Sequence, residues 1–176
     1  NHMQTIKAYL SMGQVGETLT YLDHLEEDLD AIDIAIRTGN VSVDAIVSSK
    51  LSVAAKKHIA VDCTAKMPEQ VQVTDVDLCT VLGNLLDNAI ESCEKVPEEK
   101  RFIRLYIGVF KKQLYLSVTN ATMEHRRKKL SELVSEKKGC HGFGLRRIDL
   151  VAEKYHGFVN RKNEPGVFAT EVMLPL

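Results

Sequence analysis

An apolar-periodic segment from Val76 to Cys93 constrains this chain more than any other part of the sequence. Its apolar residues recur at spacings of three and four, which predicts a helix with one buried face. Asn84 and Asn88 are four positions apart and therefore stack beside that face, with Glu91 about one turn further on. Polar groups there cost free energy unless something satisfies them. A nucleotide phosphate with Mg²⁺ would do so; the alternative is an ordinary amphipathic helix.

A glycine-rich segment, Gly139 to Gly144, precedes a second apolar-periodic helix. Glycines at the start of a helix let backbone N–H groups approach a phosphate, and the helix N-terminus favours an anion. A lone Gly-x-Gly is usually a turn, but the paired asparagines upstream make a nucleotide site the stronger interpretation. The expected apolar positions of this helix are Leu145, Ile148, Leu150, Val151 and Tyr155.

Length and charge exclude several classes of protein. With 176 residues the chain can hold one full core and a smaller element. A net charge of −1 gives no overall electrostatic case for binding nucleic acid or a membrane surface. No apolar run approaches the roughly 20 residues that span a bilayer, and from the sequence we expect no signal peptide. Because the chain does not begin with Met, we expect it to be a piece of a longer protein.

Four scattered cysteines are present, without a Cys-x-x-Cys pair: Cys63, Cys79, Cys93 and Cys140. This spacing argues against a zinc site or a disulfide framework and for a reducing compartment. Cys79 and Cys93 fall near the apolar side of their helix, where small core residues are expected.

Residues 1–40 predict a helical hairpin. A first helix reaches the Gly13–Gly16 turn, and a second runs from about Glu17 to Arg37. Two hairpins would pair as a four-helix bundle. The pattern also allows packing within one chain, but we favour the dimer. The seam of the second helix has heptad spacing and consists of Leu22, Leu25, Leu29, Ile32 and Ile36.

Residues 41–176 combine helices with short alternating strands. A helix from Ser42 or Val43 to Lys57 comes first, and Thr74 or Asp75 caps the asparagine-bearing helix. Helices grouped against a mostly antiparallel sheet predict an α+β two-layer sandwich. The expected strands cover residues 58–63, 71–73, 102–110, 114–118, 156–159 and 167–174.

On these motifs the chain resembles the GHKL ATP-binding family, which includes sensor histidine kinases, gyrase, mismatch-repair ATPases and the ninety-kilodalton heat-shock chaperone. Asn84 to Ser92 resembles the kinase N-box, and Gly142 to Leu145 resembles the G2 box. The resemblance implies a Bergerat-type ATP-binding fold for residues 41–176, preceded by the helical hairpin of residues 1–40.

A narrower resemblance is to the histidine kinases that act as peptide quorum-sensing receptors and citrate-type sensors, which are related to the sporulation phosphotransferase. The segments that carry it are Thr38–Asn40, Asp44–Ile46, Ser49–Lys50, Asp77–Cys79 and Gly83–Glu91. In that subgroup the phosphoacceptor belongs to a His-Asp-x-x-Asn pattern. Asn1 matches its Asn, so the acceptor is expected upstream of Asn1. His2 is the visible alternative; otherwise it is a bundle-surface or cloning-derived residue.

The resemblance implies roles for three asparagines. Asn88 matches the Mg²⁺ ligand. Asn84 matches the catalytic position where gyrase-type members hold a water-activating Glu. An amide cannot act as a general base, so phosphate should pass to a histidine rather than to water. Asn120 replaces the Asp that reads the adenine amine, and its side-chain oxygen can still accept that N–H.

The phosphates are expected on the backbone of Gly142, Phe143, Gly144 and Leu145, with His141 adjoining. The segment between Asn120 and Gly142 corresponds to the ATP lid. It carries six cations, of which Lys137 is included among the nucleotide-binding candidates although the pattern does not single one out. A solvated basic helix is the alternative. The six are Arg126, Arg127, Lys128, Lys129, Lys137 and Lys138.

The implied function is that of the catalytic part of a bacterial sensor histidine kinase, with ATP and Mg²⁺. Implied partners are a second copy, a response-regulator receiver domain and an upstream membrane sensor; the implied location is the cytoplasmic face of the membrane. Three alternatives are a non-catalytic relay with this fold, an anti-sigma-type serine kinase and a DNA-acting ATPase. The hairpin argues against the serine kinase, and Asn84 with the near-neutral charge against the DNA-acting enzyme.

Overall fold

The computed structural model describes residues 2–26, 34–123 and 142–176. The chain divides into two compact units, residues 1–31 and 32–176. The first contains α1 (His2–Ser11) and α2 (Val15–Glu26), joined by a turn in which Gly13 has φ +70°. Most seam positions of the predicted hairpin lie outside the described side chains, so dimerisation stays a prediction. Among the described helices, none is both long enough and apolar enough to cross a bilayer.

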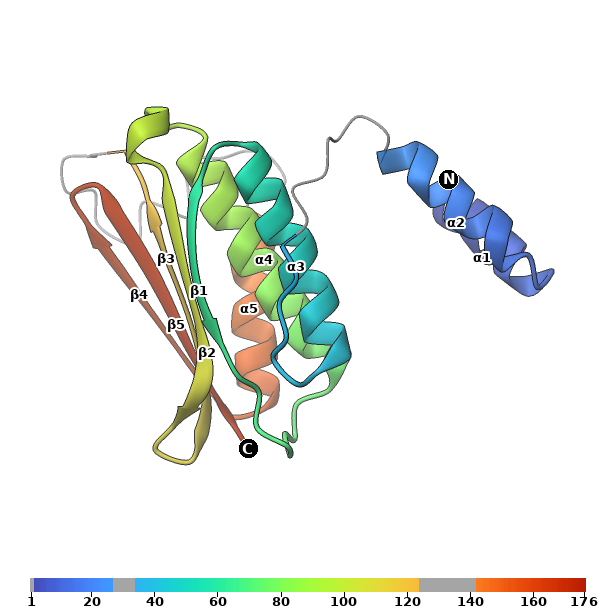
Figure 1. The fold of residues 1–176 in the computed structure, drawn as a ribbon. Helices are drawn as coiled ribbons and strands as arrows, with labels where there is room; N and C mark the ends of the chain where they lie inside the picture. Colours follow the sequence, from blue (N-terminus) through green and yellow to red (C-terminus); the bar gives the residue numbers. More distant parts are fainter. Residues whose placement is uncertain (1, 27–33, 124–141) are drawn as a thin grey trace. The chain divides into compact units, whose positions relative to one another are not determined.

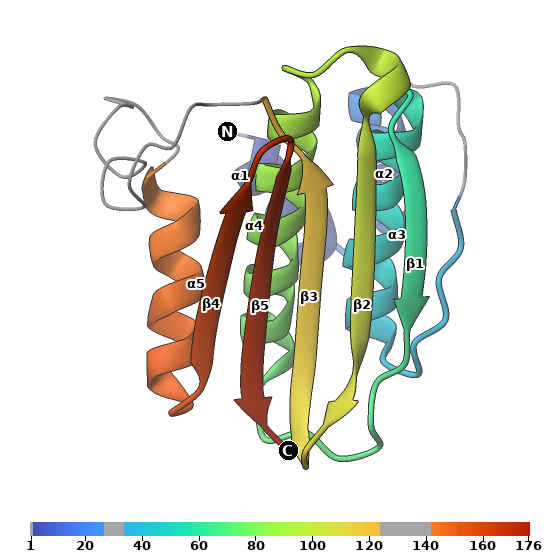
Figure 2. The same ribbon diagram turned by 90° about the vertical axis from the view of Figure 1, so that its left-hand side faces the viewer.

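The second unit has two layers (Figure 1), as predicted. Three helices, α3 (Val41–Lys56), α4 (Asp75–Cys93) and α5 (Gly142–Lys154), lie against one face of a five-stranded sheet. Figure 2 views the other face, with the helices behind the strands. A short 3₁₀ helix (Glu98–Lys100) precedes the second strand. The strands are β1 (Ala60–Ala65), β2 (Phe102–Phe110), β3 (Gln113–Ala121), β4 (Phe158–Glu164) and β5 (Val167–Pro175).

The sheet order is β1-β2-β3-β5-β4. β1 and β2 are parallel, and the other neighbours are antiparallel. Lys111 and Lys112 form a two-residue turn between β2 and β3, both with positive φ, as the twist of a tight hairpin requires. Side chains alternate along each strand, so every second residue of β2, β3 and β5 enters the core beneath the helices.

The helices begin where side chains satisfy their first N–H groups. Asn40 caps α3 by accepting from Val43 N–H at 2.9 Å, and Thr74 caps α4 through Asp77 N–H. The buried stripe of α4 matches the predicted one and includes the fully buried Leu82 and Leu86. The predicted core role of Cys93 is also confirmed, because its side chain is fully buried.

The prediction that the second hairpin helix continues to Arg37 is wrong. Residues 34–37 are not helical. Ile34 N–H donates to Ser52 Oγ at 3.1 Å and Ile36 N–H to Ser48 Oγ at 2.9 Å, so this segment runs along α3. Both isoleucines pack against the core of the second unit. Ile36 is therefore not a seam residue but packs within the second unit.

Three smaller predictions also differ from the structure. Residues 71–73 form no strand. The first strand begins at Ala60 rather than His58, because His58 has a left-handed φ of 54° that ends α3. Leu150 is 53 % exposed and does not belong to the buried face of α5. The three described cysteines, Cys63, Cys79 and Cys93, are free thiols.

Candidate functional site

The two sequence motifs meet where α4 and α5 pack together. A methyl group on Gly144 would lie 3.1 Å from Asn84 Oδ1 and 3.6 Å from both terminal atoms of the Asn88 amide. Gly144 therefore allows a close approach that a larger residue would obstruct. The paired asparagines of α4 thus face the first turn of α5.

The two asparagines differ in how their amides are held. Asn84 Nδ2 donates to the Thr80 carbonyl at 2.6 Å, one helical turn earlier, which fixes the plane of the amide. Asn88 Nδ2 is buried and has no hydrogen-bond partner among the described residues. A buried N–H group without an acceptor is costly, so Asn88 has a hydrogen-bond donor that a ligand oxygen would satisfy.

The structure places Gly142, Phe143, Gly144 and Leu145 inside the first turn of α5, rather than before the helix. The first N–H groups of a helix have no intrahelical acceptor and carry the positive end of the dipole. This turn therefore presents donors beside Asn84 and Asn88. The candidates His141 and Lys137, with the other lid cations, lie outside the described residues, as does the Phe143 side chain.

Asn120 lies near the end of β3 on the helix-facing side of the sheet. The sequence predicted a strand ending at Val118, but β3 continues to Ala121, so Asn120 is a strand residue paired with Ile103 and Phe168. Its side chain is 3 % exposed, and Nδ2 donates to the Ala121 carbonyl at 2.8 Å. With the nitrogen engaged, Oδ1 is the atom that remains to accept a hydrogen bond.

Thr170 on β5 was not assigned from the sequence. It pairs with Val118, two residues before Asn120, and its side chain enters the same face of the sheet. Thr170 is 4 % exposed, which makes it one of few buried polar side chains among the described residues. A threonine at a core-facing position of an alternating strand was the available signal.

Arg161 on β4 was also missed. Its Nη2 donates to Asp149 Oδ1 at 2.7 Å and to the Leu145 carbonyl at 3.4 Å, while its Nε is buried and finds no partner within residues 2–26, 34–123 and 142–176. The guanidinium therefore ties the first turns of α5 to the sheet. Its position holds the glycine-bearing turn in place.

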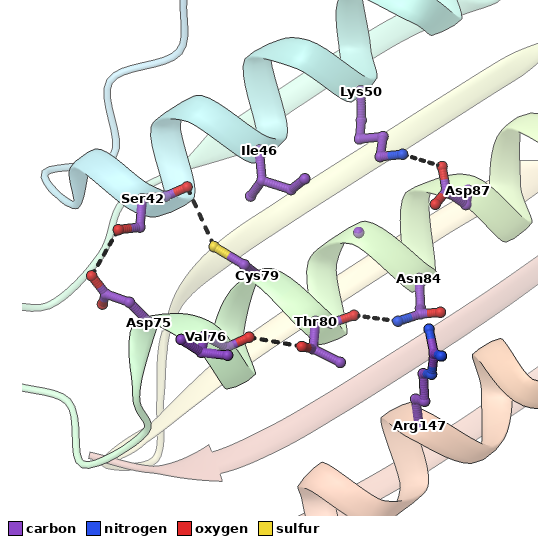
Figure 3. Close-up of a pocket in the computed structure, with 11 residues that line it drawn as sticks. Ser42, Ile46, Lys50, Asp75, Val76, Cys79, Thr80, Asn84, Asp87 and Arg147 are labelled. Atoms are coloured by element: carbon purple, nitrogen blue, oxygen red, sulfur yellow. Dashed lines mark hydrogen bonds and ion pairs between the residues drawn. The ribbon is translucent and has the colours of Figure 1, made fainter. Parts of the chain in front are cut away.

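A hollow of about 540 Å³ opens on the outer side of the helix layer. Figure 3 shows that α3 and α4 supply most of its lining, and that the Arg147 guanidinium of α5 is directed toward Asn84. Lys50 Nζ and Asp87 Oδ1 form an ion pair at 2.6 Å across it. Asn84 therefore lies between this open hollow and the turn at Gly144.

A charged cluster joins the start of α4 to the end of α5, away from the asparagines and glycines. Asp77 accepts hydrogen bonds from Lys154 Nζ and Tyr155 Oη, each at 2.6 Å, and from the Thr74 hydroxyl at 2.8 Å. These donors, Lys154 foremost, lower the pKa of Asp77 to about 2. The cluster fixes the relative position of the two helices that carry the asparagines and glycines.

The described residues contain no group of three or more His, Cys, Asp or Glu side chains suited to a metal ion. Mg²⁺ needs no such group, because it accepts few protein ligands and keeps waters and substrate phosphates. The Asn88 amide has an oxygen that suits Mg²⁺ and a buried nitrogen that a phosphate oxygen would satisfy. The residues present therefore fit a magnesium–phosphate ligand.

Known structures share this fold. The chain superposes on the catalytic domain of histidine kinase ThkA with a TM-score of 0.61 at 16 % identity, covering 84 % of this chain and 97 % of that one. It superposes on the mycobacterial sensor histidine kinase MprB with a TM-score of 0.60 at 17 % identity, covering 76 % of this chain and 93 % of that one. The superposition on the histidine kinase domain of the blue-light-activated kinase EL346 of Erythrobacter litoralis has a TM-score of 0.60 at 14 % identity, and it covers 90 % of this chain and 70 % of that one. No curated protein sequence matches the chain.

A family model described as the GHKL domain matches residues 73–175, which include five of the site residues predicted from the sequence: Asn84, Asn88, Asn120, Gly144 and Leu145. The match covers more than half of the chain. The chain therefore belongs to the GHKL family of ATP-binding domains.

Proposed function

We propose that this chain is the ATP-binding catalytic part of a bacterial sensor histidine kinase. The observation that carries the proposal is the packing of Gly144 against Asn84 and Asn88, with the Asn88 nitrogen buried and without a partner in the part of the chain that the structure describes. The backbone of Gly142–Leu145 holds the phosphates, and Asn120 accepts a hydrogen bond from the base amine. Thr170 lies on the same face as Asn120 and supplies a hydroxyl to the base pocket.

Asn88 would hold Mg²⁺ through its amide oxygen, and the ion would supply positive charge that offsets the charge of the phosphates. Asn84 cannot take a proton from water, since an amide is not a general base. Its amide orients the γ-phosphate instead. The γ-phosphate therefore passes to a histidine imidazole brought in line with it, rather than to water.

The acceptor histidine lies upstream of Asn1, and His2 is the alternative within the chain. The histidine then supplies the phosphoryl group to an aspartate on a response-regulator receiver domain. The helices of the first unit pair with a second copy, and a membrane sensor precedes them in the full-length protein. In this proposal the chain lies at the cytoplasmic face of the membrane.

The first experiment is a calorimetric titration with ATP and Mg²⁺ of the wild-type chain, Asn88→Ala and Gln70→Ala. Gln70 is an exposed side chain in the loop before α4, so its removal is a matched loss of a surface amide. We expect saturable binding by the wild type and Gln70→Ala, and at least a tenfold weaker Kd for Asn88→Ala. Repeating the titration without Mg²⁺ should reduce the difference between the wild type and Asn88→Ala.

Absence of binding by the wild type at millimolar ATP would overturn the proposal. The same fold would then act as a non-catalytic phosphotransfer relay, and Asn120, in place of a charged Asp, would be the first residue to examine. Binding that Asn88→Ala leaves unchanged would keep the nucleotide site but remove Asn88 as the Mg²⁺ ligand.

A further inference from the structure

The turn between β2 and β3 exposes apolar and basic side chains together. Val109 is 50 % exposed and Phe110 48 %. Lys111 and Lys112 follow directly and form the two-residue turn, with both side chains exposed. We call Val109–Lys112 the hairpin tip. In Figure 1 it lies at the end of the sheet opposite to the start of α5.

Positive charge surrounds the apolar part of the tip. Lys111 Nζ lies 5.3 Å from the centre of the Phe110 ring, so the ammonium covers the ring. Lys66 is exposed and follows β1, and its N–H donates to the Ile107 carbonyl at 2.9 Å, beside the same end of β2. The segments 64–68 and 106–115 contain no acidic residue.

The surface beside the hairpin tip also exposes aromatic and apolar side chains. Tyr106 is 42 % exposed, and the rings of Tyr106 and Phe110 each lie 5.9 Å from that of Tyr115. A hollow of about 350 Å³ lies beside Val109, and its mostly apolar lining includes Met67, Pro68 and Ile107 together with Lys66 and Tyr106. Beyond Ile107, β2 has no pairing with β1, so the tip extends past the edge strand.

We propose that the hairpin tip contacts an anionic lipid surface, with Phe110 and Val109 in the interfacial layer and Lys111, Lys112 and Lys66 at the headgroups. Aromatic rings favour that layer, lysines keep their charge in water while their stems lie in it, and anionic lipids attract them. A protein partner of ordinary size covers about 800 Å² and must match its shape. A convex tip of four residues fits a fluid surface better.

The register of the sheet shows that such contact leaves the nucleotide site open. At the tip, Phe110 of β2 pairs with Gln113, the first residue of β3. Asn120 lies seven residues further along β3, where it pairs with Ile103 of β2. At the rise of a strand, this separates the tip from Asn120 by roughly 23 Å. The inference stands on the hairpin alone and does not depend on the proposed kinase activity.

The chain contains no Trp, so a single introduced Trp reports on its own surroundings. We would place it at the tip with Phe110→Trp, and as a matched control at the exposed Leu150 of α5 with Leu150→Trp. Each variant is mixed with vesicles of phosphatidylglycerol and phosphatidylcholine, or of phosphatidylcholine alone. Emission is recorded at low salt and at about 0.5 M salt, where charge is strongly screened.

The expected result is a blue shift for Phe110→Trp alone, only with phosphatidylglycerol, and lost at high salt. Lys111→Ala with Lys112→Ala should weaken partitioning by roughly fivefold per lysine. The same charge change in Lys95→Ala with Lys100→Ala, two exposed lysines on the segment before β2, should have no such effect. Equal melting temperatures would confirm that all variants fold.

Two results would overturn the proposal. One is the absence of a shift for Phe110→Trp with anionic vesicles, or an equal shift for Leu150→Trp. The other is a shift with polyglutamate but not with vesicles, which would instead assign the tip to an acidic protein surface.

Discussion

Gly144 of α5 faces Asn84 of α4 so closely that a methyl group on Gly144 would stand 3.1 Å from Asn84 Oδ1. Asn84 cannot easily move away, because its nitrogen is bonded to the Thr80 carbonyl. We therefore expect Gly144→Ala to lower the free energy of unfolding by about 1–2 kcal/mol. It should also weaken nucleotide binding, because it would displace the asparagines. Urea unfolding and calorimetry would measure the two effects.

Gly83, the neighbour of Asn84 in α4, offers a control in which alanine should change stability in the opposite direction. A methyl group on Gly83 would meet only Ile46, at 3.8 Å and beyond, which is ordinary contact. Gly83 lies inside α4, where alanine is favoured over glycine by about 0.5–1 kcal/mol. Gly83→Ala should therefore stabilise the domain. If both alanine variants lost stability equally, the close approach at Gly144 would not be the cause.

Arg161→Met should release the first turns of α5 from the sheet. The variant loses the bonds to Asp149 and to the Leu145 carbonyl while keeping much of the side-chain volume. We expect a loss of about 1–2 kcal/mol, between the values for exposed and buried pairs, together with weaker ATP binding. Lys162→Met is the control, because Lys162 is exposed and its contact with Glu171 is 3.4 Å long. Similar losses in both variants would argue against a special role for Arg161.

The pKa of Asp77, lowered to about 2 from 3.8, predicts a defined dependence of stability on pH. A carboxylate with a depressed folded-state pKa stabilises the fold fully above its unfolded value, and that contribution is lost as pH falls toward the folded value. The difference in unfolding free energy between the wild type and Asp77→Asn should therefore be constant above pH 4 and shrink between pH 4 and 2.

Lys154 is the largest cause of this shift, so Lys154→Met should reduce the same pH dependence more than the loss of any other donor to Asp77. Tyr155→Phe, which deletes only the second donor, should have a smaller effect. Chemical unfolding across this pH range would measure all three variants. A Lys154→Met profile that coincided with the wild type would rule out the ion pair as the cause.

Thr170→Val tests the base pocket without a change of side-chain volume. Thr170 is buried on the face that holds Asn120, so loss of its hydroxyl should reduce selectivity for ATP over GTP by several-fold if it supports base recognition. The fold should be little affected. Thr119→Val is the control, because Thr119 belongs to the opposite face of the sheet. Unchanged selectivity would separate Thr170 from the base.

The sequence predicted α4 to within a residue, since a long apolar period and the Thr74 cap act locally. It failed at the end of α2, because Ile32 and Ile36 continue a helical period although Ile36 binds α3 instead. The period cannot distinguish a seam from a segment that packs on another element. Structure in 34–37 is decided by tertiary contacts with Ser48 and Ser52.

In the candidate site, too, features set by local sequence could be predicted, whereas features set by tertiary contacts could not. The sequence singled out Asn84, Asn88 and the glycines as candidates because their spacing within one helix or turn carries a signal, and the structure brings Gly144 close to both asparagines. Thr170 and Arg161 were missed because their positions depend on the register of β3, β4 and β5, which no single strand reveals. Alternation predicts which residues face the core, but it does not predict which strand lies opposite.

Asn88 and Gly144 come from distant parts of the chain, and the junction between them forms only when α4 and α5 pack. The unfolded chain therefore has no such site, and any ligand of the junction binds the native state alone. By linkage, a ligand at a hundredfold excess over its Kd would raise the free energy of unfolding by about 2.7 kcal/mol. The resistance of this domain to unfolding would then vary with the nucleotide supply of the cell.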